Sequence, residues 1–112
     1  MTNIRELKKL KDDITEFVKE RDWQPFHSPK NLAMALSVEV SELVEIFQWL
    51  SPEESQSPDG ARLTHIEEEI GDVMIYLTTI AMQLGLDPIK AAEKKMVKNR
   101  IKYPAPEQRP EP

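Results

Sequence analysis

Two acidic pairs, Glu39-Val-Ser-Glu42 and Glu69-Ile-Gly-Asp72, lie inside stretches of this 112-residue chain that are otherwise largely apolar. The acidic residues of each pair are three positions apart, and this spacing places them on one face of an α-helix. Carboxylates held so close repel one another, and burying them unpaired costs free energy. Magnesium would relieve both effects, because it binds carboxylate oxygens and commonly works on substrate phosphates. The pairs therefore indicate a magnesium-dependent phosphate enzyme, although manganese would suit the same oxygens.

Apolar residues at helical spacing extend on both sides of the acidic pairs, and strand signals are nearly absent. Four helices are predicted, at about residues 3–21, 29–50, 62–84 and 88–103. Ser28-Pro29 and Asp87-Pro88 each combine a capping residue with a proline in the first turn, and Gly85 supplies a helix stop. The segment 51–60 is rich in serine and proline, so we expect a surface loop there without a regular element.

The predicted fold is all-α, a four-helix bundle in a single domain over residues 1–103, followed by a mobile tail, 104–112, that contains four prolines. Facing helices of a bundle can direct carboxylates into a shared core, so the second and third helices should be neighbours. Apolar residues cover most of the circumference of the second helix, which predicts a central and well-buried position. So much apolar surface exceeds what one small domain buries easily, and a homo-oligomer, at least a dimer, is expected.

Composition argues against several classes of protein. The formal net charge is -5, with 20 acidic and 15 basic residues, so a polyanionic nucleic acid would be repelled. No segment has the length and apolarity of a membrane span, and the first residues do not form a secretory signal. The chain has no cysteine, which excludes disulfides and thiolate metal sites. A cytoplasmic protein is the simplest inference, without a nucleic-acid or membrane partner.

Aromatic residues near the acidic pairs allow two interpretations. Trp23, Phe26 and Trp49 would belong to a core or an interface in most proteins, but next to a phosphate-binding metal site such rings can hold a base by stacking. His27 is more often a structural hydrogen bonder, yet beside two aromatic residues it could contact a base or a sugar. Gly71 lowers helix propensity and allows either close ligand approach or tight helix packing.

Five runs of residues resemble the all-α nucleotide pyrophosphohydrolases of the MazG-like superfamily, especially its dCTP pyrophosphatase branch. The runs are Glu20-Arg21-Asp22-Trp23, Phe26-His27-Ser28-Pro29-Lys30-Asn31-Leu32, and the segments 39–49, 68–77 and 95–104. The paired E-x-x-E and E-x-x-D pattern is the signature of that superfamily. The resemblance extends over nearly the whole chain up to Pro104.

The resemblance implies hydrolysis of a nucleoside triphosphate between its α and β phosphates, which yields the monophosphate and pyrophosphate and cleanses the nucleotide pool. It implies magnesium ligands at Glu39, Glu42, Glu69 and Asp72. Positions that line the nucleotide pocket in the dCTP branch match Trp23, His27, Trp49 and Tyr76, while Lys95 and Asn99 are candidate phosphate contacts. Relatives are commonly tetramers with active sites near subunit contacts, so a homotetramer is expected.

One departure from the family pattern bears on base preference. Animal relatives of the dCTP branch have a histidine one turn before the phenylalanine that matches Phe17, whereas this chain has Ile14. The leading hypothesis is a pyrophosphohydrolase for dCTP and modified dCTP. A second hypothesis is a related enzyme of broad or different base preference, and a third is a non-catalytic helical interaction module. The last would not need its acidic pairs.

Overall fold

The computed structural model describes residues 2–108, and within that range the chain forms helices and no strand. This confirms the all-α prediction with its four long helices. The elements in chain order are α1 (Thr2–Glu20), η1 (Gln24–Phe26), α2 (Pro29–Phe47), α3 (Pro52–Ser55), α4 (Gly60–Gln83), α5 (Pro88–Lys102) and η2 (Pro106–Gln108).

The ends of α1 and α4 show why the chain turns where it does. After α1, Asp22 adopts a positive φ of 54°, its N–H donates to the carbonyl of Lys19, and the N–H of Trp23 donates to that of Val18. This pair of bonds satisfies carbonyls that a helix end leaves free. At the end of α4, Gly85 has a φ of 68° and performs the same reversal, as its sequence position predicts.

The beginnings of the helices are capped by side chains. Ser28 Oγ accepts a hydrogen bond of 3.1 Å from the N–H of Asn31 at the start of α2, and Asp87 Oδ1 accepts one of 2.8 Å from Ile89 at the start of α5. Both caps were predicted. The α4 helix begins at Gly60, slightly earlier than expected, because Asp59 Oδ1 accepts from the N–H of Arg62 at 2.8 Å.

The expectation of an irregular 51–60 segment is wrong for its first half. Residues Pro52–Ser55 form the short helix α3, because Ser51 and Glu54 cap it reciprocally. The Ser51 N–H donates to the Glu54 carboxylate at 2.8 Å, while the Glu54 N–H donates to Ser51 Oγ at 3.1 Å. Such a box stabilises a helical turn even where proline and serine predict a loop.

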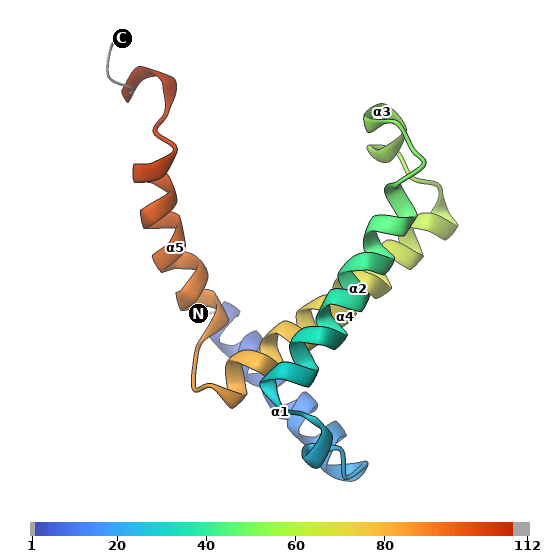
Figure 1. Ribbon diagram of the computed structural model, residues 1–112, viewed down its shortest axis with the longest axis vertical. Coiled ribbons are helices and arrows are strands. Elements are labelled where there is room, and N and C mark those ends of the chain that lie inside the picture. Colours follow the sequence, from blue (N-terminus) through green and yellow to red (C-terminus); the bar gives the residue numbers. More distant parts are fainter. Residues whose placement is uncertain (1, 109–112) are drawn as a thin grey trace.

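The centre of the molecule is the antiparallel pair of α2 and α4, which lie side by side (Figure 1). The α1 helix packs against α4, whereas α5 leaves the end of α4 in another direction. A small set of apolar side chains is buried, namely Leu7, Ile14, Leu32, Ile66 and Ala81. The helices of one chain therefore do not close around α2, and the predicted deep burial of that helix is wrong for a single chain. Val38, Val40 and Val44 are all exposed.

The predicted mobile tail, 104–112, contains a short helical segment. Residues Pro106–Gln108 of the expected tail form the one-turn helix η2. Residues 109–112 lie outside the described part of the chain, and the division into a domain at 1–103 and a tail at 104–112 stays a prediction. Across residues 2–108, no helix combines the length and apolarity that crossing a membrane requires.

Replacing Leu32 tests the packing of α2 on α4. Leu32 is only 2% exposed, so we expect Leu32→Ala to lower the free energy of unfolding by about 2–5 kcal/mol through lost burial and a residual cavity. Lys9 on α1 is exposed and polar, so Lys9→Ala provides the control, for which we expect a change within about 0.5 kcal/mol. Urea denaturation of both variants measures the difference, and equal losses would contradict this account of the core.

Candidate functional site

Carboxylates from α2 and α4 meet in the interface between these two helices. One oxygen each from Glu39, Glu69 and Asp72 lies within 4.8 Å of the others. Glu39 comes from the first predicted acidic pair, while Glu69 and Asp72 form the second. The antiparallel packing of α2 and α4 thus brings together two pairs that are 27 or more residues apart in the chain.

Glu42, the remaining member of the predicted set, lies beside this cluster. Its carboxylate is not among the three that meet within 4.8 Å, but its negative charge acts on both Glu39 and Glu69. Glu42 is one turn after Glu39 on α2, which places it next to the same site. The structure therefore gathers three of the four acidic residues closely and holds the fourth nearby.

Burial and mutual repulsion disfavour the charged forms of Glu39 and Glu69. The pKa of Glu39 is raised from 4.5 to about 7, chiefly by burial, next by a hydrogen bond with Glu69, and then by the negative charges of Glu42 and Asp72. Burial also raises the pKa of Glu69, again with repulsion from Glu42 and Asp72. Without a cation, the site therefore holds protons at a pH where ordinary glutamates are ionised.

Free acceptor atoms show that the cluster suits a hard cation. Glu39 Oε2 and Glu69 Oε2 are buried, and neither has a hydrogen-bond partner among the described residues. Buried polar atoms are normally satisfied, so such orphans call for an explanation. Carboxylate oxygens that converge from two helices and lack donors are the ligand type that magnesium or manganese accepts. The donor set therefore fits a divalent metal.

His65 is a further neighbour of the cluster that the sequence patterns did not single out. Its Nε2 lies 3.6 Å from Oε1 of Glu69, one turn later on α4. The imidazole of His65 is about half exposed, whereas Glu69 is buried. Its i,i+4 position relative to Glu69 was visible in the sequence, but an exposed histidine at that spacing is common on any helix.

A cavity of about 500 Å³ opens beside the carboxylates, between α1, η1 and α4. Its lining residues are Leu10, Asp13, Ile14, Phe17, Val18, Trp23, His27, Asp72, Ile75, Tyr76 and Thr79. This volume lies within the range of small-molecule pockets in proteins. Asp72 belongs both to this lining and to the carboxylate cluster, so the cavity and the candidate metal site are continuous.

The aromatic wall of the cavity depends on the turn that follows α1. The positive φ of Asp22 brings Trp23 back against the helix, where its ring meets the ring of Phe17 edge-on at 5.4 Å between centroids. The ring of His27 lies 6.2 Å from that of Trp23. The side chain of Asn31 donates to the carbonyl of Phe26 at 3.0 Å and ties η1 to α2. A local chain reversal thus assembles the wall.

Four of the predicted site residues line this cavity: Trp23, His27, Tyr76 and Asp72. His27 Nδ1 is buried and has no hydrogen-bond partner among the described residues, so it is free to bind a ligand group. Trp49, Lys95 and Asn99 do not line the cavity of the single chain. Trp49 follows α2 with 86% of its surface exposed, and the other two residues lie on α5, which runs away from α1 and α2 (Figure 1).

Some lining residues were missed because the sequence assigns them to a helix face and not to a site. Leu10, Ile14 and Phe17 read as the core stripe of α1, and Asp13 beside them reads as an ordinary surface charge. On α4, Asp72, Tyr76 and Thr79 recur at intervals of three or four residues, which is the only signal that could have joined Thr79 to the site.

Comparison with known proteins identifies the family to which this fold and sequence are similar. The model of the MazG-like family matches residues 34–110, which include both acidic pairs. Curated relatives include dCTP pyrophosphatase 1 of Rattus norvegicus, which is 44% identical over 91 residues, covering 80% of this chain and 54% of the relative. The Homo sapiens protein of the same name is 44% identical over 93 residues. The chain thus spans about half the length of these curated relatives.

A solved structure supports the same assignment. The crystal structure of a pyrophosphatase from Archaeoglobus fulgidus superimposes with a TM-score of 0.83 at 44% sequence identity, covering 89% of this chain and 94% of that one. The likeness to this structure and the match to the family model agree. The chain belongs to the MazG-like family.

Proposed function

We propose that this protein is a magnesium-dependent nucleotide pyrophosphohydrolase that cleaves dNTPs, dCTP and modified dCTP above all, to dNMP and pyrophosphate. The observation that carries the proposal is the position of Asp72, which joins the carboxylate cluster to an aromatic-lined cavity. The similarity to dCTP pyrophosphatase 1 supports the substrate class. In the cytoplasm, such an enzyme would remove unwanted deoxynucleotides before a polymerase can use them.

The charge of the site explains why a cation is part of the proposal. A triphosphate is strongly negative, and the carboxylates of Glu39, Glu42, Glu69 and Asp72 would repel it. These four residues are the proposed metal-holding set. A bound magnesium ion would neutralise charge on the phosphates and favour attack by water. One of the carboxylates would orient that water as a general base.

The cavity supplies the rest of the proposed substrate site. Trp23 would stack on the base, because aromatic rings bind the π-face of any base. His27, with its unpaired Nδ1, and Tyr76 would contact the sugar or base. Asp72 connects this end to the metal-holding carboxylates, so a nucleotide would lie with its base in the cavity and its phosphates toward α2.

A homo-oligomer, most simply a tetramer, completes the proposal. Many large apolar side chains are exposed on α2, α4 and α5, including Val38, Val44, Ile70, Val97 and Ile101. Large apolar side chains left exposed in such number are typical of interfaces. Trp49, Lys95 and Asn99, which do not line the cavity of their own chain, would reach a site across such an interface.

Pyrophosphate release tests the function. We expect magnesium-dependent release from dCTP and 5-modified dCTP in a panel of standard dNTPs and NTPs, and a loss of about a hundredfold or more in Asp72→Asn, because a metal-holding charge is removed. Glu68→Gln, at an exposed position next to Glu69, is the matched control and should remain active. Release spread over other bases would favour the broad-specificity enzyme. No release from any nucleotide would favour the interaction module.

The dependence of stability on pH tests the carboxylate cluster. Glu39 binds its proton more tightly in the folded state, with a pKa of about 7 against 4.5, so the stabilising effect of this proton is complete below 4.5 and is lost as pH rises through about 7. Without metal, Glu39→Gln should therefore melt at a higher temperature than the natural chain at about pH 8 and no higher at about pH 4. Thermal melts with the exposed Glu45→Gln as control measure this, and a lower melting temperature at both pH values would refute the repulsion.

Solution mass tests the oligomer. Light scattering should give two or four times the chain mass of 12.9 kDa. Val97→Ser with Ile101→Ser on exposed α5 should shift the mass toward the monomer at low concentration, because apolar interface area is lost. Lys94→Ser on the same helix is the control. A monomeric natural chain at all concentrations would contradict the proposal.

A further inference from the structure

The cavity contains a second carboxylate, Asp13, which the metal-holding cluster does not use. Asp13 comes from α1 and lines the same cavity as Asp72 of α4. It is not among the carboxylates that meet within 4.8 Å, and its charge is not among those that raise the pKa of Glu39 or Glu69, although Glu42 and Asp72 both are. Asp13 is therefore not a member of the three-carboxylate cluster, although it lines the same cavity as Asp72.

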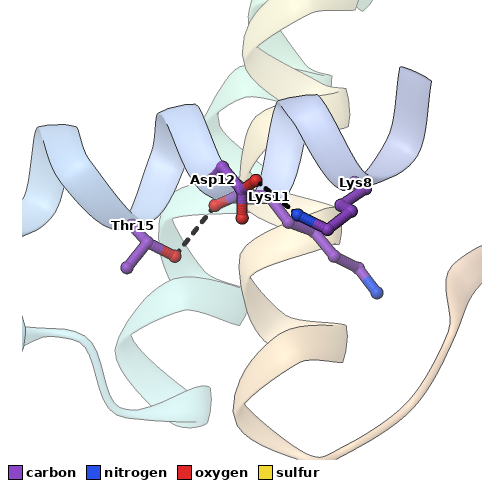
Figure 2. A network of polar contacts seen from close by, with 4 residues as sticks. All are labelled: Lys8, Lys11, Asp12 and Thr15. Atoms are coloured by element: carbon purple, nitrogen blue, oxygen red, sulfur yellow. Dashed lines mark hydrogen bonds and ion pairs between the residues drawn. The ribbon is translucent and has the colours of Figure 1, made fainter. Parts of the chain in front are cut away.

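The neighbouring residue Asp12 shows what an ordinary acidic residue of α1 does. Its Oδ2 pairs with Lys8 Nζ at 3.0 Å, and the Thr15 hydroxyl donates to the carbonyl of Lys11 at 2.8 Å on this exposed part of the helix (Figure 2). Successive residues of a helix are rotated by about 100°. Asp13 is thus turned away from this network, and among the described side chains it has no ion pair and no hydrogen bond.

Aromatic and aliphatic side chains make up most of the wall around Asp13. Leu10, Ile14 and Phe17 are its neighbours on α1 within the lining, and Trp23 lies against Phe17. An ionised carboxylate can accept hydrogen bonds but cannot donate one. Asp13 itself is exposed, so water can satisfy its carboxylate in the free protein. A ligand that displaces this water must supply a donor in its place, because otherwise the acceptor is left unsatisfied and binding free energy is lost.

We propose that Asp13 is a base-contacting specificity residue, which accepts a hydrogen bond from the exocyclic amino group of a nucleobase and makes the cavity favour aminopyrimidines over ketopyrimidines. The inference rests on the proposed nucleotide substrate. An aspartate carboxylate is a suitable partner for the amino group of cytosine. Uracil and thymine present a carbonyl oxygen at the same position, where two acceptors would face and repel each other. Cytosine and uracil are otherwise nearly the same shape, so this one contact can distinguish them.

The test compares dCTP with dUTP in the full-length protein and in Asp13→Asn. An asparagine side chain can turn its NH₂ group toward the uracil carbonyl, so the ratio of kcat/KM for dCTP to that for dUTP should fall by about tenfold or more. The dUTP reaction should be retained or improved, which shows that the variant is folded. Asp12→Asn, which removes the outward-facing carboxylate, should leave the ratio unchanged.

The outcomes separate this inference from the proposed function. A ratio that is the same in Asp13→Asn and the natural chain would overturn it, as would a fall in both rates that excess magnesium restores, because Asp13 would then serve the metal site. If the natural chain hydrolyses no nucleotide, the proposed function fails. Calorimetry with dCMP and dUMP then decides: tighter binding of dCMP that Asp13→Asn abolishes supports the role of Asp13, and equal binding of both nucleotides by the natural chain overturns it.

Discussion

The packing of α2 against α4 is the interaction on which the rest of the structure depends. It buries Leu32 and Ile66 and aligns the two helices antiparallel, so that Glu39 faces Glu69 and Asp72. Burial of apolar side chains favours this arrangement, while the repulsion between the carboxylates opposes it. The interface between α2 and α4 therefore contains unfavourable repulsion between carboxylates, which a bound divalent cation would relieve.

This repulsion acts at the carboxylates that are proposed to hold the metal. Burial and repulsion raise the pKa of both Glu39 and Glu69, and each has a buried oxygen that finds no hydrogen-bond donor within residues 2–108. Strongly perturbed carboxylates next to a cavity are typical of functional sites, because a purely structural core would replace them with apolar residues. The two ends of α4, in contrast, have structural roles. Its N-terminus is capped by Asp59 and its C-terminus ends at a left-handed glycine.

The cavity depends on a different part of the chain, the reversal after α1. Asp22 in the left-handed region returns Trp23 to the Phe17 ring, and η1 then carries His27 to the same wall. The helices that define the cavity also leave wide apolar surfaces on α2, α4 and α5 exposed. One chain therefore contains the three-carboxylate cluster and the aromatic-lined cavity, while its exposed apolar surface favours association with further copies.

Several features were determined by the sequence alone. Helical periodicity, the Ser28 and Asp87 caps and the Gly85 stop are local, so they predicted the long helices within a few residues. The two acidic pairs predicted a metal-binding cluster, because their spacing already aligned each pair on one helix face. The resemblance in the runs around them also indicated the family. The reciprocal cap of Ser51 and Glu54 was equally local, but the proline and serine around it concealed it.

Only the tertiary structure decided which residues share a site. Periodicity cannot distinguish a helix face that meets a neighbouring helix from one that lines a cavity. It therefore did not identify Asp13, and it gave no reason to choose Thr79 over other residues on its helix face until α1 was placed against α4. The family resemblance led to the prediction that Trp49, Lys95 and Asn99 contact the nucleotide, but in one chain they do not line the cavity. The prediction overestimated the burial of α2. Apolar residues around the whole helix show that it is able to be buried, but the positions of the other helices decide how much of it they cover.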